Sequence, residues 1–152
     1  METVTDVYIE PTMGQMQQVM LDLPQDVAVP VMQDSEAGSL YICEDYVLTV
    51  AVYPGGDLVK TLTEATGFSP EMLQPVMSQQ EGNTRYECVW TAAGEGENQV
   101  GRACVIDDGM YHYVLTAMAP EQKAGRLQEG VWQSIFRSFR TTEPGSFTHT
   151  GS

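Results

Sequence analysis

The chain has 152 residues, 42% of them apolar, so it is long enough for one domain to bury a core and too short for two ordinary domains. It carries 21 acidic side chains against seven lysines and arginines, and the resulting formal net charge of -14 argues against nucleic acid and anionic membrane surfaces as partners. Residues 1–84 hold 13 of the acidic side chains and a single basic one, Lys60. No run of about 18 apolar residues is present and the first residues lack the regions of a signal peptide, so we expect neither a membrane span nor a signal segment in the sequence as given.

The N-terminal part is predicted to begin with a flexible leader over residues 1–15, which show no periodicity. Residues 16–23 alternate polar and apolar side chains, which predicts a strand. Residues 27–32 predict a second short strand. Pro30 cannot donate a ladder hydrogen bond, so we expect this strand at a sheet edge.

The middle of the chain predicts strands followed by a short helix. Residues 39–44 and 46–53 are expected to form one strand or a pair of strands. Asp57 can cap a helix over residues 58–65, and Gly67 supplies its end.

The C-terminal part gives the clearest pattern. After a single helical turn at residues 70–73 and a strand at 76–80, three further strands are predicted to form an antiparallel meander, over residues 85–92, 100–107 and 110–118. A helix then starts near Pro120. Its apolar stripe, which should cover one face of the sheet, consists of Leu127, Val131, Trp132, Ile135, Phe136 and Phe139.

Five segments of the chain form a recognisable set: LDLP at 21–24, LVKTLTEATGFSP at 58–70, RYECVW at 85–90, GRACVIDDGMYHYVLTAMAP at 101–120 and WQSIFRSF at 132–139. Together they resemble the PsbP-like superfamily of small α/β domains, which includes uncharacterised bacterial members of lipoprotein type. These are core and turn signatures, so they bear on the fold, and no functional residue of the family can be carried over. Most members are binding or assembly factors, which implies a binding function here.

The predicted architecture is an α+β domain over residues 16–140, followed by a flexible tail over 141–152. Its antiparallel sheet of about five to seven strands is packed by a short middle helix and a long C-terminal helix.

The three cysteines, Cys43, Cys88 and Cys104, are too widely spaced for a C-x-x-C redox or zinc pattern. If the hairpin at 94–98 is symmetric about Gly96, Cys88 lies opposite Cys104, within the distance that a disulfide spans. A disulfide between them would indicate an oxidising compartment. The alternative is that both are small buried apolar residues, and Cys43 lies outside this pair in either case.

The same register would make two further favourable pairs. It places Arg85 opposite Asp107 as an ion pair and Trp90 opposite Arg102 as a cation–π pair. Both pairs support the predicted register.

No catalytic, cofactor-binding or metal-ligating residue is predicted. His112 alternates with tyrosines in a strand, which favours a surface or half-buried histidine over a ligand. The glycines at 94, 96 and 101 lie in a hairpin and do not open a helix, so they do not indicate a dinucleotide site. Asp107, Asp108 and Gly109 lack the spacing of a calcium loop and are typical of a turn.

The sequence therefore favours a non-catalytic, extracytoplasmic domain that binds a protein partner, with no nucleic-acid or cofactor partner. A cytosolic chaperone or adaptor of the same fold is the alternative. An enzyme or ion-binding domain with no recognisable motif is the third possibility, and the identity of the partner and the oligomeric state stay open.

Overall fold

The computed structural model of the chain describes residues 2–4, 18–23, 30–34, 38–80 and 82–142. Seven strands form one large sheet: β3 (Pro30–Asp34), β4 (Gly38–Ile42), β5 (Val47–Pro54), β6 (Val76–Gln80), β7 (Asn83–Ala92), β8 (Gln99–Asp107) and β9 (Tyr111–Pro120). All neighbours are antiparallel, and the order across the sheet is β3-β4-β5-β9-β8-β7-β6. Strands β3 and β6 are therefore its two edges.

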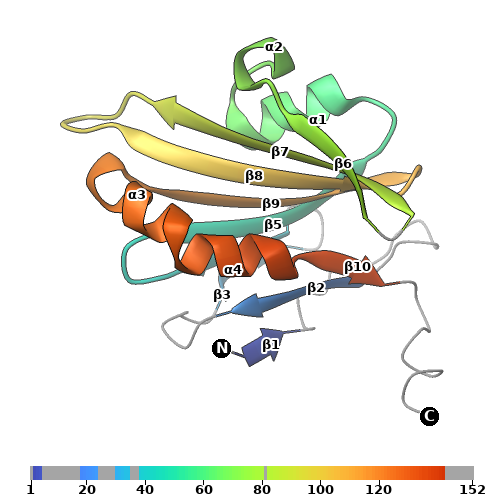
Figure 1. Cartoon of the computed structure of the whole chain (residues 1–152), viewed down its shortest axis with the longest axis horizontal. Coiled ribbons are helices and arrows are strands. Elements are labelled where there is room, and N and C mark those ends of the chain that lie inside the picture. The colour runs from blue at the N-terminus through green and yellow to red at the C-terminus, as the bar shows by residue number, and fades with distance from the viewer. Residues whose placement is uncertain (1, 5–17, 24–29, 35–37, 81, 143–152) are drawn as a thin grey trace.

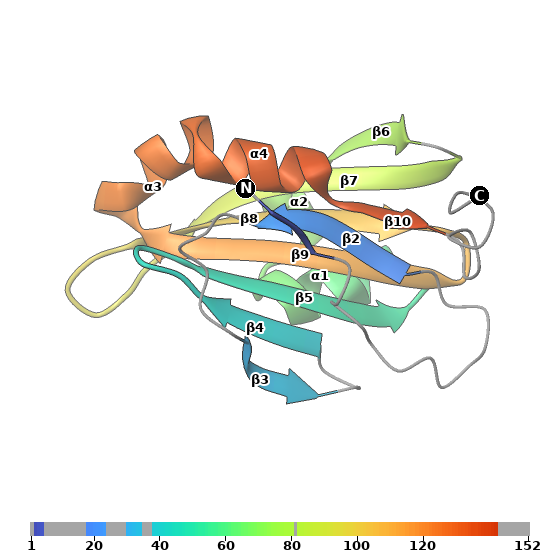
Figure 2. The same cartoon turned by 90° about the horizontal axis from the view of Figure 1, so that it is seen from below.

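A smaller sheet brings together segments that are far apart in the sequence. Its strands are β1 (Glu2–Val4), β2 (Gln18–Leu23) and β10 (Arg140–Thr142), with β2 in the middle. The helices are α1 (Leu58–Thr66), α2 (Pro70–Leu73), α3 (Glu121–Glu129) and α4 (Val131–Ser138). Figures 1 and 2 show α1 and α2 on one face of the large sheet, and α3, α4 and the small sheet on the other.

Each face of the large sheet covers its own apolar core. On the α4 face, Trp132, Ile135 and Phe136 are fully buried against strand side chains that include Leu115. Burial of one such large apolar side chain contributes about 2 to 3 kcal/mol. On the α1 face, Leu62 packs in a second cluster with residues of β7, β8 and β9.

Local signals in the sequence account for the start and the end of helix α1. The Asp57 side chain accepts a hydrogen bond from the Lys60 amide at 3.1 Å, which satisfies one open amide of the first turn of α1. Gly67 ends the helix with a φ of 85°, a conformation that glycine adopts without strain.

The predicted fold class is confirmed, with one difference in the C-terminal helix. Residues expected to form one long helix form α3 and α4, because the chain bends at Gly130 (φ -116°, ψ -101°). The Gly130 amide donates to the carbonyls of Arg126 and Leu127 and closes α3. Only Ala124 of α3 is buried, whereas α4 buries three large side chains.

The ends of the chain also differ in part from the prediction. Residues 2–4 of the predicted leader are strand β1, which pairs with β2. The rest of the leader, 5–15, lies outside the described residues. Two residues of the predicted tail, Thr141 and Thr142, belong to β10, and the remainder lies outside the described residues.

Candidate functional site

Strands β7 and β8 pair one residue away from the predicted register. Cys88 lies opposite Ala103, and Cys104 lies opposite Glu87. Because successive residues of a strand point to opposite faces, Cys104 enters the core under α4 while Cys88 enters the core under α1. The predicted disulfide between Cys88 and Cys104 is therefore wrong, and both residues are free thiols.

Trp90 gives a physical reason for the observed register. It lies opposite Gly101, and a Cβ atom added to this glycine would come within 2.2 Å of the indole carbon Cζ2. Because any larger residue at this position would collide with the ring, the glycine leaves room for the indole against β8. The predicted pairs of Arg85 with Asp107 and of Trp90 with Arg102 are also wrong, because the observed register differs by one residue from the predicted one.

Burial favours the protonated form of both thiols, which is the less reactive form. It raises the pKa of Cys88 to about 11, with a further contribution from the negative charge of Glu87. Burial likewise raises the pKa of Cys104 to about 12. Both side chains are therefore protonated near neutral pH and serve as small core residues.

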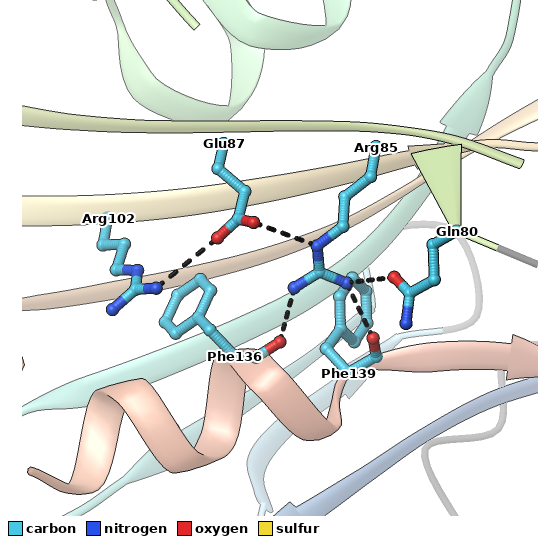
Figure 3. A network of polar contacts seen from close by, with 6 residues as sticks. All are labelled: Gln80, Arg85, Glu87, Arg102, Phe136 and Phe139. Atoms are coloured by element: carbon cyan, nitrogen blue, oxygen red, sulfur yellow. Dashed lines mark hydrogen bonds and ion pairs between the residues drawn. The ribbon is translucent and has the colours of Figure 1, made fainter. Parts of the chain in front are cut away.

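A buried arginine ties strand β7 to the end of helix α4, as Figure 3 shows. Arg85, 6% exposed, donates to the main-chain carbonyls of Phe136 at 2.5 Å and Phe139 at 2.9 Å. These carbonyls lie at the C-terminal end of α4, where open acceptors and the helix dipole favour a positive charge. Arg85 also donates to the side chains of Gln80 at 2.8 Å and Glu87 at 3.1 Å.

Glu87 links this arginine to a second one. Its other carboxylate oxygen lies 3.4 Å from the guanidinium of Arg102 on β8. The Arg102 guanidinium also lies 4.6 Å from the centre of the Phe136 ring, a cation–π distance. Arg102 thus finds its aromatic partner on α4 and not on the neighbouring strand.

These side chains form the floor of an open groove between α4 and β6. We call it the arginine groove; its cavity measures about 340 Å³. It is lined by Ser78, Gln79, Gln80, Arg85, Glu87, Arg102, Gln133 and Arg137. Three of the seven lysines and arginines of the sequence lie here together with one carboxylate, so the groove carries a formal charge of about +2 in a strongly acidic chain.

Strand β6 forms the outer wall of this groove and is an open sheet edge. Among the strands that the structure describes, it pairs with β7 only, and its sequence VMSQQ carries no charge. Val76 is 70% exposed and Met77 is 62% exposed, and Met72 of the adjacent α2 is 69% exposed. We call Met72, Val76 and Met77 the edge patch.

His112 is buried, contrary to the predicted surface or half-buried position. It is 1% exposed, its Nδ1 lies 2.5 Å from the Thr61 hydroxyl, and its Nε2 lies 3.4 Å from a carboxylate oxygen of Asp107. Thr61, His112 and Asp107 are residue types that also form the nucleophile, base and acid of catalytic triads. However, the Thr61 hydroxyl belongs to a residue only 2% exposed, so the contact joins α1 to the sheet rather than meeting a substrate.

The carboxylates of Asp107 and Asp108 in the β8–β9 turn accept hydrogen bonds from main-chain amides of the same turn. Asp107 accepts from the Gly109 amide, and Asp108 accepts from the amides of Met110 and Tyr111. Asp108 also accepts from the hydroxyl of Tyr113. Across the described residues, no group of three or more histidine, cysteine or acidic side chains could hold a metal ion.

Among the helices within the described ranges, none is long and apolar enough to cross a membrane.

Comparison with known proteins identifies the fold. No protein-family model matches the sequence, and no curated protein matches it closely enough to count as a relative. A solved structure of LpqN, involved in cell envelope biogenesis of Mycobacterium tuberculosis, is similar with a TM-score of 0.60 and 13% identity, over 85% of this chain and 86% of that one. Cyanobacterial PsbP from Synechocystis sp. PCC 6803 is similar with a TM-score of 0.54 and 12% identity, over 82% and 86%.

A third similar structure is the Ran-binding protein Mog1p of Saccharomyces cerevisiae. Its TM-score is 0.52 at 14% identity, over 80% of this chain and 89% of that one. These similarities confirm the PsbP-like fold expected from the sequence. At such low identity they show the fold alone.

No motif in the sequence predicts the arginine groove. Its lining comes from β6, β7, β8 and α4, so it exists only after the correct register and the placement of α4 are known. One signal is present in the sequence: six of the seven basic residues fall after residue 84, in the part of the chain that contains β7, β8 and α4.

Proposed function

We propose that this chain is a non-catalytic domain that acts outside the cytoplasm and binds a protein partner through the open edge at β6. The fold supports a binding role, because one of the proteins that it resembles is described as Ran-binding.

The proposal depends on strand β6, which is an exposed and uncharged edge of the large sheet. An edge strand presents unpaired amides and carbonyls, and proteins commonly protect such edges with charged side chains, proline, bulges or a covering element. Strand β6 is short, but all of its residues from Val76 to Gln79 are exposed and none is charged. The edge patch consists of three exposed apolar side chains, Val76 and Met77 of β6 and Met72 of α2, and an extended segment of a partner can pair with such an edge.

The polar groups of the chain support a non-catalytic role. The one carboxylate that lines the arginine groove, Glu87, is held by two arginines and is therefore not available as a free base. Thr61, which has a histidine at hydrogen-bonding distance, is buried.

The extracytoplasmic location is supported by LpqN, which is described as involved in cell envelope biogenesis. The cysteines no longer support it, because the predicted disulfide is absent. A cytosolic adaptor is the second candidate: the buried thiols Cys88 and Cys104 suit a reducing compartment, and Mog1p is described as Ran-binding. Protease accessibility of the natural gene product in intact cells and in cells with a permeabilised envelope distinguishes these locations.

Site-specific crosslinking tests the binding surface. A photoreactive amino acid is placed at Ser78 of β6 or, as a control, at the exposed Gln122 of α3, in the native host. We expect a crosslink to one defined protein from Ser78 and none to that protein from Gln122. A crosslink to the same protein from both positions would contradict the proposal.

A matched pair of substitutions makes this test specific. Met77→Lys places a charge on the edge patch, whereas Met110→Lys changes a methionine of similar exposure, 58%, in the β8–β9 turn. Met77→Lys should suppress the crosslink from Ser78, and Met110→Lys should leave it intact. Thermal melts should show both variants folded, because neither side chain is buried.

A further inference from the structure

We infer that the partner segment which docks on β6 is acidic and that the arginine groove receives its carboxylate side chains. This inference rests on the proposed function and adds the chemistry of the partner. It follows from the charge of the groove, from the hydrogen bonds of its arginines and from the face on which they lie.

Charge sets the groove apart from its surroundings. The sequence has three acidic side chains for every basic one, yet three of its seven basic residues line this one groove. Neither β6 nor α4, which form its walls, contains an acidic residue. An acidic segment would therefore be repelled by most of the chain and attracted to this groove.

The three arginines differ in how far their guanidinium groups are already engaged in hydrogen bonds and ion pairs. Arg85 is buried and uses its donors on the end of α4, so it holds the groove together. Arg102 meets a single carboxylate oxygen at 3.4 Å and keeps 19% of its side chain exposed. Arg137 is exposed and forms no ion pair with the residues that the structure describes, so its guanidinium is available for a bidentate contact with a carboxylate.

The register of β6 places the groove on one face of any added strand. Ser78 lies opposite Arg85 and Val76 lies opposite Glu87, so these β6 side chains share the α4 face with the groove. An added strand would lie about 4.8 Å beyond β6 and would direct every second side chain to this face. A glutamate at such a position is long enough to reach over β6 toward the groove, while the alternate side chains would meet Met77 on the opposite face.

The fitting partner is therefore an extended segment in which acidic residues alternate with apolar or neutral ones. Main-chain hydrogen bonds to β6 would supply affinity, and the arginines would select acidic side chains. Because Arg137 is exposed, this selection should weaken as salt is added.

A defined peptide pair tests the inference. The probe is a blocked peptide of about ten residues that alternates threonine and glutamate, and its control carries glutamine in place of every glutamate. Titration of the isotope-labelled full chain, followed by nuclear magnetic resonance, gives both dissociation constants and the amides that move. We expect the glutamate peptide to bind at least about fivefold more tightly, with shifts at β6 and the arginine groove, and we expect salt to reduce the difference.

Three variants test whether the groove causes the difference. Arg137→Gln should weaken binding of the glutamate peptide about fivefold, whereas Arg126→Gln, at an exposed arginine of α3, should not. Glu87→Gln should strengthen it, because the change removes a negative charge and keeps an oxygen that can accept from Arg85.

Equal binding of the two peptides, binding of neither, or equal effects of the Arg137 and Arg126 changes would overturn the inference. Dimerisation of the chain through β6, seen by sedimentation and removed by Met77→Lys, would overturn it in favour of a second copy as the occupant. A crosslink from Ser78 that requires Met77 but survives Arg137→Gln would leave the proposed function standing and remove this inference alone. If Met77→Lys leaves that crosslink unchanged, the proposed function itself fails.

Discussion

Arg85 stabilises the fold because it pairs a buried positive charge with acceptors that would otherwise lack partners. Its guanidinium reaches two main-chain carbonyls at the end of α4, the Glu87 carboxylate and the Gln80 amide oxygen. A guanidinium is suited to this task because its donors are fixed in a plane. The hydrogen bonds of Arg85 thus connect β7 to α4, the helix that forms one wall of the groove.

Arg85→Met should lower the free energy of unfolding by about 3 kcal/mol, because it leaves buried acceptors without donors. Arg126→Met, at an exposed position of α3, should change it by less than about 0.5 kcal/mol. Urea denaturation of the two variants and the parent chain measures both values. A loss at Arg85 no larger than at Arg126 would show that the network contributes little.

The cysteines make a prediction that separates the observed register from the expected one. Trypsin cleaves after Arg85, Arg102 and Lys123, so Cys88 and Cys104 fall in different peptides. Unfolded under non-reducing conditions, both should react with an alkylating agent and appear by mass spectrometry as separately alkylated peptides. A disulfide-linked peptide pair would instead support the register symmetric about Gly96.

The raised pKa values of the buried thiols predict weaker stability at alkaline pH. Unfolded thiols ionise above their ordinary value of 9.0, whereas Cys88 and Cys104 stay protonated in the folded chain until about 11 and 12. The stabilisation that follows from the raised pKa values is therefore fully present below pH 9.0. It is lost as the pH rises toward the pKa values of the thiols in the folded chain. Because the unfolded state loses protons first, the free energy of unfolding falls over this range.

Cys104→Ala tests this linkage. Denaturation at about pH 8 and about pH 10.5, with reductant present, gives the decrease in the free energy of unfolding for each protein. The decrease should be smaller in the variant, because one titrating thiol is gone. The same decrease in both proteins would show that Cys104 does not carry the effect.

Glycine acts differently in strand β8 and in helix α3. At Gly101 an added Cβ would collide with the Trp90 ring, whereas at Gly125 an added Cβ would meet no heavy atom of the described residues within 4 Å outside its chain neighbours and the backbone of its own helix. Gly101→Ala should therefore destabilise the chain by more than about 1 kcal/mol, because the core must shift. Gly125→Ala should stabilise it by about 0.5 to 1 kcal/mol through a better helix propensity.

Thermal melts of the two alanine variants check these opposite signs. Equal destabilisation by both would contradict the account of the β7–β8 register, because Gly101 would then have no special role.

Most elements could be predicted from the sequence because their signals are local. The alternation in β2, the cap at Asp57, the proline turns around α2 and the spacing of the last three strands each depend on neighbouring residues. The register of β7 and β8 could not be read in the same way. It depends on how a six-residue loop is closed and on a ring that needs glycine across the ladder.

The bend at Gly130 could not be predicted from the sequence for a related reason. Glycine weakens a helix without necessarily ending it, and whether the chain bends is decided by packing. Here α4 buries Trp132, Ile135 and Phe136, while α3 remains largely exposed, so the two segments meet the sheet differently.

Across the whole chain, charge and fold together define the surface proposed for binding. The composition argues against nucleic acid as a partner, but it does not indicate where the few positive charges gather. The PsbP-like fold brings β6, β7, β8 and α4 together and so places three arginines beside an uncharged sheet edge. The candidate site could not be predicted because it is a product of tertiary structure and contains no sequence motif.

Amide hydrogen exchange of β6 tests the central claim most directly. In the isolated chain, amides of Val76–Gln80 that do not pair with β7 should exchange quickly, because they face open solvent. When the protein crosslinked from Ser78 is added, exchange in this strand should slow, with little change in α1 or α3. Protection of another surface, with exchange in β6 unchanged, would contradict the account.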